Sequence, residues 1–143
     1  MGEIPLILLN LQDEGYHLLV EIEMYNQSFK AVLDTGASKT VFDKARMEDY
    51  VDAEAIRRSN HLSTGLGTNE MESYTLVVPD LQIGSVHVSD YEVALLDLST
   101  INLAYESMAQ DPVIGVIGGD LLKKYHALID YRKETLLLYP PED

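Results

Sequence analysis

The dominant pattern in this chain is an alternation of apolar and polar residues with a period of two, which is typical of β-strands that bury one face. It is clearest over residues 16–33, where two alternating runs flank Asn26-Gln27 and predict a hairpin that turns at that pair. Many short strands at regular spacing favour a small β-barrel or sandwich. The other predicted strands are residues 4–11, 41–42, 74–78, 81–83, 86–88, 91–96, 127–131 and 135–139.

Helical patterns are few and short. Residues 44–57 show a broken helical pattern, and short helices are predicted within 99–110 and over 121–125. No linker, low-complexity tract or solenoid repeat interrupts the sequence. At roughly 100–200 residues per domain, a chain of 143 residues predicts one domain, residues 1–143.

The charge balance restricts the partners that this chain can bind. It has 10 Lys and Arg residues against 24 Asp and Glu residues, a net charge of −14. A surface this acidic repels a phosphate backbone, so we expect no nucleic-acid partner. Hydrophobic residues make up 46%, which is ordinary for a folded globular domain and argues against disorder.

The absence of cysteine, of paired histidines and of a long apolar segment argues against several kinds of site and against insertion into a membrane. Cysteine is absent, which removes disulfides, thiolate metal sites and thiol nucleophiles, and no two histidines have the spacing of metal ligands. No run approaches the ~20 apolar residues of a membrane helix. A signal peptide requires a basic residue before its apolar segment, and none precedes the apolar stretch 4–11. We expect no membrane insertion and favour the cytoplasm, although the absence of cysteine does not fix the compartment.

The segment with the clearest chemical content is the end of the second predicted hairpin strand. Apolar residues lead into Asp34, and Gly36 lets the backbone turn tightly just after it. A carboxylate at the end of a buried strand is costly unless it is hydrogen-bonded or functional. Two interpretations follow from the residues alone: an Asx turn, in which Asp34 bonds its own backbone, or a catalytic acid.

These residues resemble the retropepsin-like aspartic protease family. Val32-Leu33-Asp34-Thr35-Gly36-Ala37-Ser38 matches the family signature position by position, and Val116-Ile117-Gly118 matches its later hydrophobic-hydrophobic-glycine turn before a short helix. Two weaker matches are a glycine-bearing flap hairpin and the closing hairpin over residues 127–139. The flap residues are Thr64, Gly65, Leu66 and Gly67. The resemblance spans residues 16–139 and implies a closed or nearly closed β-barrel with two or three short helices.

The mechanism that this resemblance implies needs two carboxylates that share one proton and hold a water molecule between them. This chain has one Asp-Thr-Gly, and Ser63-Thr64-Gly65 has serine where the carboxylate would stand. The resemblance therefore implies a C₂ homodimer in which Asp34 of each subunit meets on the axis. Such a dimer would carry 2 × −14 = −28 charges, so its contacts need a substantial apolar surface.

The resemblance also assigns supporting roles. Thr35 would bond across the dyad, Gly36 would admit the substrate backbone, and Gly65 and Gly67 would let the flap close and exclude water. Gly118 would pack close behind the catalytic loop. We expect Asp120 to cap the helix that follows rather than to act in catalysis.

Ala37 allows a separate prediction. A serine at this position could donate a hydrogen bond to the carboxylate and favour its charged form, which alanine cannot do. We therefore expect a less acidic pH optimum than that of an Ala37→Ser variant.

Taken together, the sequence predicts an aspartic endopeptidase, a hydrolase that acts on peptide or protein substrates with water as nucleophile. Asp34 is the catalytic residue, Thr35 to Ser38 support it, and no metal or organic cofactor is expected. The alternative is a retropepsin-like domain that does not cleave and serves as a peptide-binding or oligomerisation module. A third interpretation, an unrelated acidic β-rich binding domain, places Asp34 in a surface turn with no symmetry mate.

Overall fold

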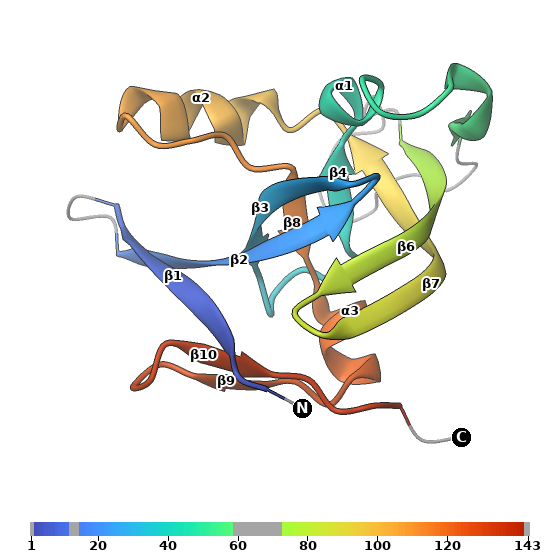
Figure 1. Cartoon of the computed structure of the whole chain (residues 1–143). Helices are drawn as coiled ribbons and strands as arrows, with labels where there is room; N and C mark the ends of the chain where they lie inside the picture. The colour runs from blue at the N-terminus through green and yellow to red at the C-terminus, as the bar shows by residue number, and fades with distance from the viewer. Residues whose placement is uncertain (1, 12–14, 59–72, 142–143) are drawn as a thin grey trace.

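The structure, a computed structural model, describes residues 2–11, 15–58 and 73–141. These ranges hold mostly strand, with three short α-helices and one 3-10 turn (Figure 1). None of the helices in them is long and apolar enough to cross a membrane. The helical elements are α1 (Lys44–Met47), η1 (Ala53–Ala55), α2 (Ser99–Ser107) and α3 (Gly119–Lys124). The strands are β1 (Ile4–Asn10), β2 (Tyr16–Met24), β3 (Gln27–Leu33), β4 (Val41–Asp43), β5 (Arg57–Arg58), β6 (Tyr74–Ile83), β7 (Val86–Leu96), β8 (Gly115–Ile117), β9 (Leu128–Asp130) and β10 (Thr135–Leu137).

The central strands close into a barrel. Neighbours pair in the order β6, β7, β4, β8, β3 and β2, and β2 returns to β6 where Glu23 lies opposite Gln82. The pairs β3–β8 and β4–β7 are parallel, whereas the other pairs are antiparallel. The prediction of a closed, mostly β barrel with two or three short helices is confirmed.

The predicted hairpin over residues 16–33 is present, but its turn lies one residue earlier than predicted. β2 and β3 pair through to Met24 opposite Gln27, so the turn residues are Tyr25 and Asn26. Their φ angles are 53° and 61°, as a two-residue turn with φ > 0 at both positions requires. Asparagine tolerates that conformation and tyrosine seldom adopts it, so the sequence pointed to the wrong pair.

The four short strands predicted between residues 74 and 96 are two long ones, β6 and β7. Their register continues across Pro79, because Val78 lies opposite Tyr91 and Asp80 lies opposite Ser89. On its other side β6 pairs with β5 and β2 only near its ends, within the described sheet. Pairing therefore resumes in the same register after Pro79, and the proline does not end the strand there.

The broken helical pattern over residues 44–57 forms only α1 and η1. Val51 and Ile56 both pack against the main core. Five residues along one continuous helix would turn them about 140° apart, on different faces. The chain therefore leaves the helix, and η1 returns it toward the core.

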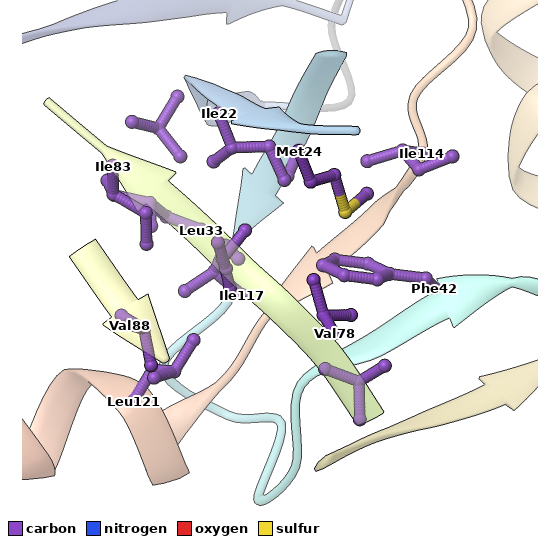
Figure 2. Close-up of a cluster of buried hydrophobic side chains, with 14 of the residues drawn as sticks. Ile22, Met24, Leu33, Phe42, Val78, Ile83, Val88, Ile114, Ile117 and Leu121 are labelled. Carbon is purple, nitrogen blue, oxygen red and sulfur yellow. The ribbon is translucent and has the colours of Figure 1, made fainter. Parts of the chain in front are cut away.

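The main core fills the barrel. Ile22, Leu33, Phe42, Val78 and Ile117 come from five different strands, and their side chains point toward one another (Figure 2). Ile22, Phe42 and Val78 have no measurable exposure to solvent. The strand that leads to Asp34 therefore ends in a tightly packed interior, which fixes where the loop begins.

A second, smaller core lies where α2 packs on the outside of the barrel (Figure 1). Tyr105 of α2 packs there with Val32 of β3 and Val113, and all three are buried. The Tyr105 hydroxyl is also 2.7 Å from Nδ1 of His17 on β2. β3 therefore has apolar packing on both of its faces.

The first strand pairs within its own chain, a point that the sequence left open. β1 lies between β2 and β10, with Leu8 opposite Leu18 and Ile4 opposite Leu136. The closing hairpin of β9 and β10 follows, and β9 is the last strand of the described sheet. In Figure 1 these three strands form a layer beside the barrel, near the N-terminus.

Candidate active site

Asp34 directly follows β3, and its side chain is exposed. Its backbone N–H donates to the carbonyl oxygen of Ile117 on β8 (3.0 Å). This bond extends the parallel pairing of β3 and β8 and fixes the backbone where the loop begins. The N–H of Gly36 donates to Asp34 Oδ1 (2.9 Å). This is the Asx turn considered from the sequence, and it orients one carboxylate oxygen within the loop.

The loop is fastened to the start of α3 by backbone hydrogen bonds. The N–H of Ala37 donates to the carbonyl of Asp34 (3.1 Å), and the carbonyl of Ala37 accepts from the N–H of Gly119 (2.7 Å). Thr35 and Ser38 are exposed, and Ala37 is half-buried. The loop therefore presents its side chains outward while its backbone is held from behind.

Gly118 lies against this loop at very close range. A Cβ on residue 118 would stand 2.7 Å from both the carbonyl carbon and the oxygen of Lys39, and 2.9 Å from the oxygen of Ala37. Its φ and ψ are −102° and −174°, which any residue can adopt. Glycine is needed here for space rather than for conformation.

A polar cluster that the sequence did not reveal lies behind the same loop. The hydroxyl of Thr40, a fully buried residue, accepts from the N–H of Gly118 (3.1 Å) and donates to Asp120 Oδ1 (2.8 Å). The Tyr91 hydroxyl of β7 donates to Asp120 Oδ2 (2.6 Å). We call Thr40, Tyr91 and Asp120 the loop clamp.

The expectation that Asp120 caps the helix is wrong. The residue at the N-cap of α3 is Gly118, and Asp120 is the second residue of the helix. Its two carboxylate oxygens receive the hydroxyls of Thr40 and Tyr91, which are 80 and 29 residues away along the chain. A local pattern could not identify partners at such distances.

Opposing effects act on the pKa of Asp120. Partial burial raises it, but the hydrogen bonds from Tyr91 and Thr40 outweigh burial, so the pKa lies below its ordinary value. The pKa of Tyr91 is raised, first by burial and then by its bond to Asp120. At neutral pH the clamp therefore holds a carboxylate and a neutral phenol.

The other predicted site residues fall into two groups. Val116 and Ile117 form β8 beside β3, with Val116 opposite Val32 and Ile117 opposite Leu33. The flap residues Thr64, Gly65, Leu66 and Gly67 lie outside the described residues. Among the residues that are described, no three His, Asp or Glu side chains cluster as metal ligands.

Comparison with known proteins agrees with this architecture. The sequence model of a family described as aspartyl protease matches residues 20–121. The chain is 26% identical over 130 residues to DNA damage-inducible protein 1 of Neurospora crassa, an alignment that covers 87% of this chain. It spans about a quarter (26%) of that relative's length.

Solved structures share the fold at low identity. The retroviral protease-like domain of Ddi1 from Leishmania major has a TM-score of 0.61 at 16% identity, with 89% of this chain and 94% of that chain covered. A retropepsin-like aspartic protease from Rickettsia conorii has a TM-score of 0.64 at 21% identity, with 96% and 91% covered. EIAV protease in complex with an inhibitor has a TM-score of 0.57 at 17% identity, with 85% and 99% covered.

The family match includes the Asp34 loop and the β8 turn that holds it, and these solved folds extend the likeness over most of the chain. This chain belongs to the aspartyl protease family and has the retropepsin-like fold.

Proposed function

We propose that this chain is an aspartic endopeptidase that works as a homodimer, with Asp34 of each subunit forming the catalytic pair. The observation that carries the proposal is the exposed Asp34 carboxylate on a loop whose backbone is fixed by β8 and α3. A reacting group needs both access to substrate and a fixed position, and this arrangement supplies both.

The chemistry follows from two carboxylates that share one proton. The ionised one takes a proton from a bound water molecule, whose oxygen attacks the scissile carbonyl carbon. The protonated one donates its proton to the carbonyl oxygen and so stabilises the tetrahedral intermediate. The intermediate then collapses: the C–N bond breaks, and the carboxyl group that took the proton from water gives it to the leaving amine. One chain supplies one Asp-Thr-Gly, so the second carboxylate is the partner's Asp34.

The closing hairpin supplies apolar surface that supports association of two copies. Leu128 is 51% exposed on β9, and Tyr131 is 66% exposed in the turn that follows. β9 is the last strand of the described sheet, so a second copy could continue the ladder there. Such contacts would offset the repulsion between two subunits that each carry −14.

The decisive experiment combines cleavage with a measurement of mass. A peptide library is incubated with the wild type and with Asp34→Asn from acidic to neutral pH, and sedimentation velocity follows both proteins. We expect cleavage by the wild type under the conditions in which sedimentation shows a dimer, and no cleavage by the variant under any condition. Cleavage by a strictly monomeric protein, or undiminished cleavage by Asp34→Asn, would overturn the proposal. Binding of peptides without cleavage would favour the non-cleaving alternative.

A further inference from the structure

The loop clamp fixes the direction of each of its hydroxyl protons. The N–H of Gly118 can only donate, so Thr40 Oγ1 is its acceptor. The proton of the Thr40 hydroxyl then points at Asp120 Oδ1, and that of Tyr91 points at Oδ2. The hydrogen bonds of the loop clamp are all formed only when the carboxylate of Asp120 accepts at both of its oxygens.

We propose that Asp120 is a positioning residue for the Asp34 loop, which it holds in its reactive geometry through Thr40 as long as Asp120 is ionised. The proposal rests on the function proposed above. Asp120 does not touch substrate. It acts because Thr40 lies at the end of the loop and Gly118 lies directly behind it.

Protonation of Asp120 disrupts this arrangement. Two hydroxyls already direct their protons at the carboxylate, so an added proton competes with one of them for an acceptor. If Thr40 turns its proton away, that proton has to find another acceptor in a fully buried position. The hydrogen bond between Thr40 and Asp120, which links the end of the loop to α3, is then weakened.

The groups around the clamp can modulate its titration. Tyr91 of β7 contacts the carboxylate directly. On α3, the ammonium of Lys124 lies 5.5 Å from the centre of the Tyr91 ring and 5.7 Å from that of Tyr125. On the loop side the charged residues are Asp34 and Lys39, both exposed. Lys124 is thus the cation that α3 places beside the clamp.

Tyr91→Phe is the sharpest test, because it removes one hydroxyl and leaves every loop residue unchanged. With one donor fewer, the ionised form of Asp120 is less favoured, so the acidic limb of the pH–kcat profile should move to higher pH. We expect kcat to fall on the order of tenfold, with KM nearly unchanged, because a small displacement of a reacting group is costly. Tyr16→Phe, at a side chain 61% exposed on β2, is the matched control and should match the wild type.

A second measurement does not depend on cleavage. Amide hydrogen exchange of Gly118 and Gly119 is followed by NMR at neutral and acidic pH, in the wild type, Tyr91→Phe and Asp120→Asn. We expect protection of Gly118 to fall by roughly tenfold in both variants, the scale of one hydrogen bond. In the wild type it should fall further on acidification than in Asp120→Asn. Unchanged exchange together with superimposable pH profiles would overturn the proposal. A protein that shows the exchange pattern but cleaves nothing would refute the proposed function alone.

Discussion

Gly118 and Gly119 are adjacent glycines whose replacement by alanine should affect the stability of the fold to very different extents. At residue 118 a new Cβ would stand 2.7 Å from two backbone atoms of Lys39 and 2.9 Å from the oxygen of Ala37. At residue 119 its nearest contact would be 3.3 Å, to that same oxygen. Since φ and ψ of Gly118 suit alanine, a loss of stability in Gly118→Ala does not come from backbone strain at that residue.

The magnitude follows from these contacts. Carbon atoms attract best at roughly 3.5–4.0 Å, so Gly118→Ala must push the backbone at Lys39 back by about 0.8 Å. Overpacking of this kind costs about 1–3 kcal/mol, and rigid backbone on the opposing side favours the upper half of that range. Replacing a glycine also gains about 0.4–1 kcal/mol by restricting the unfolded chain. We expect a net loss near 2 kcal/mol for Gly118→Ala and a change near zero for Gly119→Ala.

Urea unfolding at neutral pH measures the free energy of unfolding of each variant, and peptide cleavage measures the effect of each substitution on the Asp34 loop. A shift of the loop by a large fraction of an ångström should lower kcat/KM by on the order of tenfold to a hundredfold in Gly118→Ala. Equal stability and equal activity of the two variants would show that the loop does not depend on the close approach of Gly118.

Three further predictions concern pH and assembly. The pKa of Asp120 is lowered in the folded chain, so its contribution to stability is complete above the unfolded value of about 3.8 and is lost as pH falls through the folded value. Asp120→Asn should therefore be less stable than the wild type at neutral pH, with the gap closing below about pH 4 in a series of urea titrations. Ala37→Ser should move the pH optimum of cleavage downward, and an upward shift would contradict the role given to the hydroxyl. Leu128→Asp should weaken the dimer by roughly tenfold to a hundredfold in sedimentation equilibrium, the value of one buried leucine. Leu103→Asp, at a side chain 64% exposed on α2, should leave the dimer intact, and equal weakening by both would argue against the β9 surface.

The sequence could predict what depends on near neighbours along the chain. The alternation over residues 16–33 predicted β2 and β3 because each strand buries one face, and the glycine after Asp34 predicted a turn. The resemblance of residues 32–38 and 116–118 to retropepsins supplied the fold. The positive φ of Tyr25 and the continuation of β6 through Pro79 escaped prediction because tertiary pairing overrides local preference.

The loop clamp escaped prediction for a different reason. Thr40, Tyr91 and Asp120 are ordinary polar residues, and each has a plausible local role: a strand start, a strand edge and a helix cap. Only the closure of the barrel brings Thr40 and Tyr91 within hydrogen-bonding distance of Asp120. Local sequence patterns contain no signal for hydrogen bonds between residues so far apart along the chain.

The parallel pairing of β3 with β8 has a consequence for how the protein is made. Ala31 lies opposite Gly115, so the two strands that shape the Asp34 loop are separated by 115 − 31 = 84 residues. Contacts of such high sequence separation form late and slow the search for the native state. While the chain emerges from the ribosome, a nascent segment that ends before residue 117 lacks the carbonyl that receives the Asp34 N–H. The Asp34 loop is therefore among the last parts of the chain to become ordered.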